Sequence, residues 1–196
     1  MGETIHISDL AGHGNELTAW QILKEVSQQA IERQQFVINP FVIEISDDGH
    51  FHLASTQEQH AGFAAPEIAP SSQKQYDEAN TVWSLGATVF FVVLGQLVMN
   101  GKGGLAQTKT SKLPYMRNEW PRLSELVQQC LNYAPQLRPT LKTIWETATH
   151  EIERCQNDVK RGPKFKALPT DSNSSLEHEQ DFAFWPESMQ STKVKQ

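Results

Sequence analysis

Three stretches of the chain place apolar residues three and four positions apart, the spacing of an amphipathic helix. The first follows Asn15, a good helix cap, the second ends before Pro135, and the third begins near Pro139. Their apolar residues are Leu17, Trp20, Ile22 or Leu23, Val26 and Ala30; Leu123, Leu126, Val127, Cys130 and Leu131; and Leu141, Ile144, Trp145 and Ala148. We therefore predict three helices that each pack through one face.

A fourth helix is predicted at about residues 80–95, within the most apolar stretch of the sequence, residues 81–98. Its apolar residues surround the helix instead of forming a stripe, which is typical of a helix at the centre of a helical domain. A membrane span is the alternative. The stretch contains Thr, Ser, Gln and Gly and lacks a basic flank, so the buried helix is favoured.

Between the first two predicted helices, two β-branched runs flank the sequence Ser46-Asp47-Asp48-Gly49. Asp-Gly between apolar runs is typical of a hairpin, so we predict strands at about residues 41–45 and 50–54. Residues 55–75 are expected to form a loop with one helical turn at residues 65–69, and residues 96–118 are expected to be irregular. The fold class is thus mainly α with one short β-hairpin.

The length of 196 residues suits one domain with a tail. Residues 1–157 carry the predicted elements, whereas residues 158–196 lack apolar periodicity and are predicted to be a flexible tail. Within that tail, residues 181–189 concentrate Phe182, Phe184 and Trp185. This segment could dock on the domain or on a partner, or it could be an incidental aromatic cluster.

The formal net charge of -6 and the lack of a Lys/Arg cluster argue against a nucleic-acid partner. Two cysteines cannot form a disulfide framework, which favours a reducing compartment. The N-terminus lacks the basic and apolar regions of a signal peptide. We therefore expect a cytoplasmic protein.

Three short motifs follow one another along the chain: Ala65-Pro66-Glu67, then Trp83-Ser84-Leu85-Gly86, then Arg138-Pro139-Thr140. Together with the order of helices and hairpin, they resemble the C-terminal lobe of protein kinases over about residues 5–155. In that family the arginine of the third motif pairs with the glutamate of the first. The resemblance therefore implies an ion pair between Glu67 and Arg138, and it gives Ala65, Pro66, Glu67, Trp83 and Arg138 structural roles.

The hairpin allows the family's catalytic positions to be located in this sequence. When Pro40 is aligned with the proline of the kinase catalytic loop, the catalytic aspartate falls on Val37 and the metal-binding asparagine on Val42. The metal-binding aspartate of the second strand falls on Ser55. Phosphoryl transfer needs hard oxygen ligands for magnesium and a base for the acceptor hydroxyl. Because Val37, Val42 and Ser55 lack these groups, and the small lobe has no counterpart here, we expect no kinase activity and no cofactor.

A kinase large lobe without a small lobe or catalytic residues resembles the KIND domain, the kinase non-catalytic C-lobe domain. That family implies a scaffold or regulatory module that binds a protein or peptide. The first candidates for contact with a partner are aromatic residues outside the periodic faces: Phe36, Phe41, Trp120, Phe182, Phe184 and Trp185. The alternative is an atypical phosphotransferase or nucleotide-binding regulator that receives its small lobe from another chain.

Other chemistries find little support in the sequence. His50, His52 and His60 could hold a metal, but no cysteine or carboxylate joins them at ligand spacing along the chain. The Gly-rich residues 100–109 lack the Gly-Lys-Ser/Thr ending of a phosphate-binding loop. No serine stands in a nucleophile elbow. We therefore expect neither a metal site nor a nucleophilic site.

Overall fold

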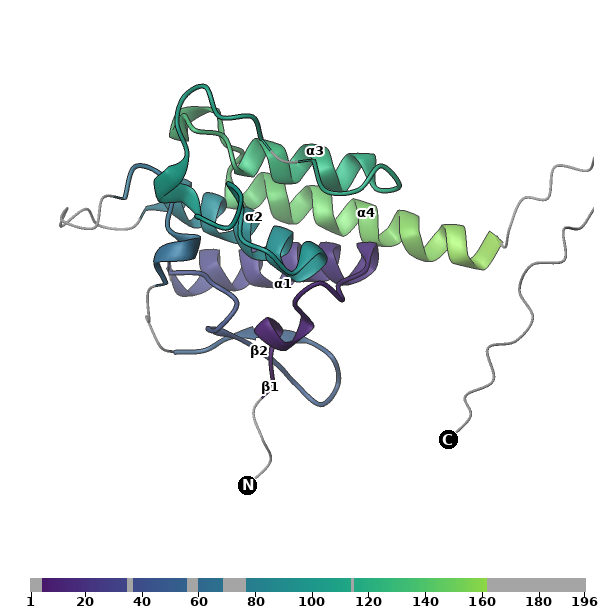
Figure 1. The fold of residues 1–196 in the computed structure, drawn as a ribbon. Coiled ribbons are helices and arrows are strands. Elements are labelled where there is room, and N and C mark those ends of the chain that lie inside the picture. The colour runs from purple at the N-terminus through teal and green to yellow at the C-terminus, as the bar shows by residue number, and fades with distance from the viewer. Residues whose placement is uncertain (1–4, 35–36, 56–59, 69–76, 114, 162–196) are drawn as a thin grey trace, which may run out of the picture. The chain divides into compact units, whose positions relative to one another are not determined.

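The computed structural model describes residues 5–34, 37–55, 60–68, 77–113 and 115–161, with only the backbone of residues 158–161. In this part of the chain the fold is mainly α, with four α-helices and one small antiparallel sheet (Figure 1). The helices are α1 (Glu16–Arg33), α2 (Glu78–Leu94), α3 (Pro121–Cys130) and α4 (Leu141–Arg161). The strands are β1 (Ile5–His6), β2 (Ile43–Ile45) and β3 (Phe51–Leu53).

Helix α2 lies in the hydrophobic core, as its uniformly apolar composition predicts. Nearly all of its residues after the first turn are buried, and Trp83 and Leu85 are fully so. The Asp77 carboxylate accepts from the backbone N–H of Asn80 at 2.9 Å, and Gly95 ends the helix in a left-handed conformation. None of the helices in the described ranges combines the length and hydropathy needed to cross a bilayer.

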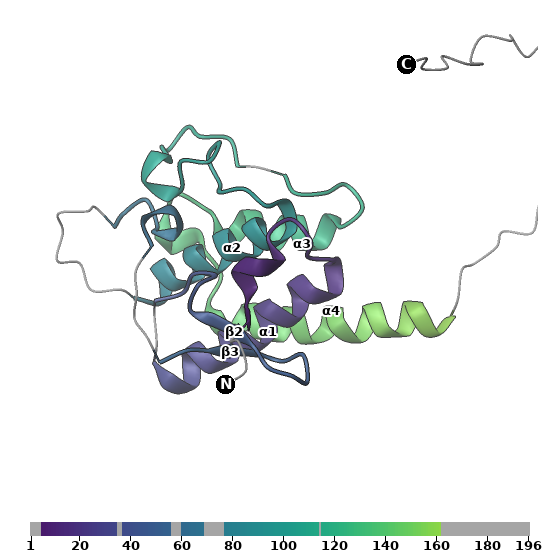
Figure 2. The same cartoon turned by 60° about the horizontal axis from the view of Figure 1, so that its bottom comes forward.

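The three predicted amphipathic helices are present. At the start of α1, the Asn15 side chain accepts from the backbone N–H of Thr18 at 2.9 Å, so the predicted cap is confirmed. Helix α1 packs along α4 and also contacts α2, while α2 packs against α3 (Figures 1 and 2). Helix α4 begins at Leu141 and continues past residue 157 to Arg161.

The hairpin is present, but its strands are shorter than the predicted 41–45 and 50–54, because only three residues of each strand pair in the ladder. A third strand, β1, pairs antiparallel with β2 and places Ile5 opposite Ile45. This two-residue strand is absent from the sequence prediction. The strand order β1-β2-β3 leaves one side of β3 as a sheet edge.

Side chains of α1 cover this edge of β3. Glu25 accepts from the N–H of Phe51 at 2.7 Å, and Gln29 donates to the carbonyl of the same residue at 2.7 Å. Gln29 also accepts from the N–H of Leu53 at 3.0 Å, and Arg33 donates to the carbonyl of Leu53 at 2.6 Å. We call Glu25, Gln29 and Arg33 the α1 clasp. The clasp satisfies every backbone group that Phe51 and Leu53 direct away from β2.

The segment after the hairpin differs in detail from the prediction. The helical turn expected at residues 65–69 lies earlier, in η2 (Ala61–Phe63), where the His60 ring accepts from the N–H of Gly62 at 3.2 Å. The described residues of the expected turn, 65–68, form a single turn that is not part of a helix, closed by a hydrogen bond of 3.0 Å from the N–H of Ile68 to the carbonyl of Ala65. Residues 96–113 and 115–118 are mostly irregular, as predicted, with one short 3₁₀ turn, η3 (Gly104–Ala106).

Candidate functional site

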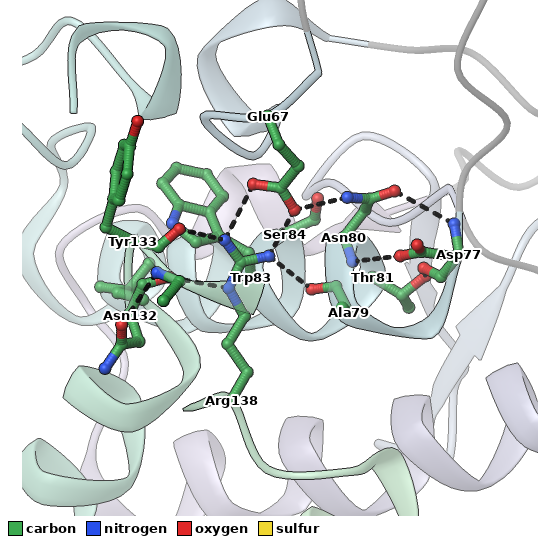
Figure 3. A network of polar contacts seen from close by, with 12 residues as sticks. Glu67, Asp77, Ala79, Asn80, Thr81, Trp83, Ser84, Asn132, Tyr133 and Arg138 are labelled. Atoms are coloured by element: carbon green, nitrogen blue, oxygen red, sulfur yellow. Dashed lines mark hydrogen bonds and ion pairs between the residues drawn. The ribbon is translucent and has the colours of Figure 1, made fainter. Parts of the chain in front are cut away.

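Arg138 lies in the segment that precedes α4, and its fully buried side chain reaches the first turn of α2 (Figure 3). Its guanidinium forms a bidentate ion pair with Glu67, at 2.6 Å from Nη1 to Oε1 and 2.9 Å from Nη2 to Oε2. It also donates to the carbonyls of Ala79 at 2.9 Å, Asn132 at 2.7 Å and Tyr133 at 3.3 Å. All five guanidinium N–H groups therefore have acceptors. The ion pair implied by the kinase resemblance is present.

Glu67 is only half-buried and is held in place from a second side. The side-chain amide of Asn80 donates to its Oε1 at 2.5 Å, and Asn80 is fixed by reciprocal bonds with Asp77 at the start of α2. Burial by itself favours the protonated acid, but the hydrogen bonds and charge of Arg138 outweigh it and hold the pKa of Glu67 below its usual range. We call Glu67, Asn80 and Arg138, with the three carbonyls, the glutamate–arginine cluster.

The three positions aligned with catalytic residues offer no charged group. Val37 and Val42 are buried, with 8% and 1% of their surfaces exposed, and Ser55 is exposed after the end of β3. The backbone of Val42 takes part in the hairpin, because its carbonyl accepts from Ala54 at 2.8 Å. Val37 and Val42 therefore act as core residues.

Phe41 projects from the turn between these two valines, with 45% of its surface exposed. Its ring lies 5.1 Å from that of His60, and both rings contact the buried Phe63, whose ring packs edge-on against Phe91 in α2. The turn itself is fixed by Asn39, whose side chain accepts from the Phe41 N–H at 3.0 Å. The result is an exposed aromatic patch on a fixed turn, made of Phe41 and His60.

The other predicted contact residues lie in different places. Trp120 is half-buried at the start of α3, packed against the core with the Arg117 guanidinium 5.2 Å from its ring centre. Phe36 lies outside the described residues, as do Phe182, Phe184 and Trp185. Of the six contact candidates, the structure thus places Phe41 and Trp120, and only Phe41 is an exposed aromatic residue.

Gln107 and Asn80 make buried polar contacts that no sequence pattern predicted. We call these contacts, together with the glutamate–arginine cluster, the polar framework. Gln107 is buried and joins α2 to the end of α3, because it accepts from the Trp83 indole at 2.9 Å and donates to the Leu131 carbonyl at 2.8 Å. Asn80 stands in the first turn of a helix, a common position for an asparagine that bonds only locally. Its contact with Glu67 depends on a segment thirteen residues away in the sequence.

The described residues hold no group of three His, Cys, Asp or Glu side chains arranged to bind a metal ion. His50 instead contacts Glu25, with 2.9 Å between Nδ1 and Oε1, and His52 points to solvent from β3. The hydrogen bond and charge of Glu25 raise the pKa of His50. No protein-family model matches the chain.

Proposed function

We propose that this protein is a non-catalytic interaction module with the architecture of a protein kinase C-lobe, similar to a KIND domain, and that it binds a protein or peptide partner in a scaffolding or regulatory role. One observation carries the proposal. The glutamate–arginine cluster joins the Ala-Pro-Glu and Arg-Pro-Thr motifs by a fully satisfied bidentate ion pair. The resemblance implied this contact from residues that are 71 positions apart.

The side chains of the hairpin support the absence of phosphoryl transfer in this proposal. A transferred phosphoryl group needs magnesium held by carboxylate or amide oxygens, and an acceptor hydroxyl needs a base. Val37 and Val42 present hydrocarbon that is packed into the domain, and Ser55 presents a neutral hydroxyl. Such side chains cannot supply the electrostatic stabilisation on which this reaction depends.

The exposed aromatic patch of Phe41 and His60 is the surface that we assign to the partner. Exposed aromatic rings on a rigid support often dominate binding energy, because they bury a large area at a small cost in conformational entropy. The turn that carries Phe41 is held by Asn39 and by the neighbouring Phe63. A chain with two cysteines cannot form a disulfide framework, and on this ground we propose a reducing compartment, the cytoplasm, as its location.

The catalytic part of the proposal is tested by thermal unfolding with ATP and magnesium or manganese. A ligand at 100 times its Kd would stabilise the folded state by about 2.7 kcal/mol, which raises Tm by several degrees. We expect no rise. A clear rise with nucleotide and metal together would overturn the proposal in favour of a nucleotide-binding regulator.

The binding part is tested by affinity capture from the native cell with wild-type protein and the Phe41→Asp variant. Phe41 keeps 45% of its surface exposed, so this variant should lower Tm only slightly through the lost contact with Phe63, while a partner held by the aromatic patch should be lost. His52→Asp is a matched control, because it also adds a carboxylate at an exposed position near the hairpin. A partner retained equally by both variants would rule out the aromatic patch as its binding surface.

A further inference from the structure

A second surface of the domain has the features of a peptide-binding site. A cavity of about 550 Å³ lies beside Glu67 and the segment that joins α3 to α4. Its lining consists of Glu67, Lys109 and residues 132–137. We call it the tyrosine cavity, after Tyr133. Its volume falls within the range of about 300–1,000 Å³ that is usual for ligand sites.

The tyrosine cavity is lined largely by apolar surface. Tyr133 and Leu137 expose 43% and 64% of their surfaces, and Leu137 is the most exposed large apolar residue in the described part of the chain. Ala134 and Pro135 lie between them in the sequence and also line the cavity. Exposed apolar side chains that gather in one place and are bordered by polar residues often mark an interaction site.

Hydrogen bonds hold the segment that carries these side chains. The Asn132 side chain accepts from the N–H of Ala134 at 2.9 Å, and the N–H of Leu137 donates to the carbonyl of Ala134 at 3.0 Å. The buried Arg138 guanidinium binds the carbonyls of Asn132 and Tyr133. This wall of the cavity is therefore preformed, which lowers the entropic cost of binding.

The surroundings of the cavity are basic, although the protein as a whole is acidic. The one carboxylate in the lining, that of Glu67, is already paired with the guanidinium of Arg138. The two segments that supply the other lining residues, 104–117 and 131–142, have no acidic residue, whereas the formal net charge of the protein is -6. Their basic residues are Lys109, Lys112, Arg117, Arg138 and Lys142.

This charge distribution favours one kind of occupant. In a two-fold dimer formed through the cavity, the Lys109 side chains of the two copies would lie in the same interface, and two chains with a net charge of -6 repel each other. A peptide that presents carboxylates next to bulky apolar side chains instead complements both the Lys109 ammonium and the apolar lining.

We propose that the tyrosine cavity binds an acidic peptide segment of a partner protein, with a bulky apolar side chain against Tyr133 and Leu137 and a carboxylate near Lys109. The cavity shares no lining residue with the aromatic patch of Phe41 and His60, so this proposal does not depend on the proposed function.

An NMR titration of the full chain tests the proposal. The probe is the synthetic peptide acetyl-Asp-Leu-Asp-Leu-Asp-amide, added up to millimolar concentrations to isotope-labelled protein. We expect saturable shifts of the amide resonances of Lys109, Tyr133 and Leu137. Two control peptides, acetyl-Lys-Leu-Lys-Leu-Lys-amide and acetyl-Asp-Ser-Asp-Ser-Asp-amide, lack the charge and the apolar side chains respectively, and each should bind at least about fivefold more weakly.

Variants of the lining locate the site. Lys109→Glu should raise the Kd of the acidic probe about fivefold, since an exposed ion pair is replaced by repulsion. Lys142→Glu is the matched control, because Lys142 is an exposed lysine on α4 that does not line the cavity. Leu137→Ser should also weaken binding, whereas Leu105→Ser should not, because Leu105 is an exposed leucine outside the lining.

Three results would overturn the proposal. They are the absence of saturable shifts at the lining residues, equal binding of the acidic and basic probes, and equal effects of Lys109→Glu and Lys142→Glu. Sedimentation velocity distinguishes the second copy. A dimer that forms with increasing protein concentration and is lost in Leu137→Ser would show that the cavity is occupied by another copy of the chain, and this would overturn the peptide proposal.

Discussion

The glutamate–arginine cluster and the α1 clasp on the β2–β3 hairpin both join segments that are distant in the sequence, but only the cluster does so with a fully buried cation. Arg138 has no exposed side-chain surface and depends on Glu67 for its counter-charge. The hairpin is held through backbone groups of β3 that bond to side chains of α1. These α1 side chains are partly or fully exposed to solvent. Breaking the cluster leaves a buried charge without its partner, whereas breaking a bond between α1 and β3 leaves a neutral backbone group without a hydrogen bond.

This difference explains why the residues of the cluster and the residues aligned with kinase catalytic positions are constrained in different ways. The cluster tolerates little change, because any loss leaves a buried group unpaired. Val37 and Val42, which align with catalytic residues, are apolar and buried, so they need no polar or charged partner. The architecture of the domain and the chemistry of the hairpin therefore depend on different residues.

The largest expected effect comes from breaking the cluster with Arg138→Ala. We expect a loss of about 3–5 kcal/mol in the free energy of unfolding, because Glu67 and three carbonyls lose their donor. Urea unfolding monitored by circular dichroism measures it. Lys142→Ala removes an exposed lysine 3.9 Å from Glu146 and should cost less than about 0.5 kcal/mol. Equal losses in the two variants would mean that the buried ion pair stabilises the fold no more than an exposed one.

Placing a polar group at a buried position that aligns with a kinase catalytic residue should have the next largest effect. Val42→Asn puts an amide at a position where only 1% of the residue's surface is exposed, and we expect a loss of about 3 kcal/mol in the free energy of unfolding. The same unfolding measurement applies, with the exposed His52→Asn as control. If Val42→Asn were as stable as wild type, the hairpin would have space and partners for polar ligands, and the contrast between the two regions would disappear.

Removing one member of the α1 clasp should cost less. Gln29→Ala leaves the N–H of Leu53 and the carbonyl of Phe51 without side-chain partners, with an expected loss of about 1–2 kcal/mol. Gln28→Ala is the matched control, because Gln28 is exposed and its side chain bonds to Glu32 on the same helix. Hydrogen exchange of the Leu53 amide should speed up in the first variant and not in the second.

Acid should weaken the glutamate–arginine cluster, because the charge of Glu67 is lost on protonation. The folded-state pKa of Glu67 lies below the reference value of 4.5, so its stabilising contribution is fully present above that pH and is lost as pH falls through the folded-state pKa. Between about pH 5 and pH 3, the Tm of wild type should therefore fall more steeply than that of Glu67→Gln. If Tm fell equally steeply with pH in the two proteins, the Glu67 carboxylate would have the same pKa in the folded and unfolded states.

The smallest expected effect is the titration of His50 beside the hairpin. Its pKa is raised above 6.5, first by the hydrogen bond with Glu25 and then by the charge of that residue. The associated stabilisation is present below pH 6.5 and is lost as pH rises through the folded-state pKa. An NMR titration of the imidazole should show this raised pKa, and Glu25→Gln should lower it. An unchanged pKa in that variant would exclude Glu25 as the cause.

Sequence periodicity was sufficient to predict the helices, since one buried face leaves a regular pattern in residues such as Leu123, Val127 and Leu131. The sequence did not predict β1, because a two-residue strand has no periodicity and its partner Ile45 lies forty positions away. The α1 clasp was missed for a related reason. On an amphipathic helix, polar residues such as Gln29 are expected to face solvent, and nothing in the local sequence indicates that a strand edge lies beside them.

The candidate site was predictable where a motif linked distant residues and not elsewhere. Glu67 and Arg138 belong to recognisable motifs, so their contact could be expected before any coordinates were known. Asn80 and Gln107 complete the polar framework without belonging to a motif. Their partners are set by tertiary packing, which the sequence alone does not specify.

The α1 clasp also determines how the small sheet can meet other molecules. An uncovered strand edge is a template on which another extended chain can add by backbone hydrogen bonding, and it is a common starting point for aggregation. On β3 the outward backbone groups are already bonded to Glu25, Gln29 and Arg33. A foreign strand would have to displace four hydrogen bonds to α1 before it could pair with β3. Strand addition at this edge is therefore blocked as long as α1 keeps its place.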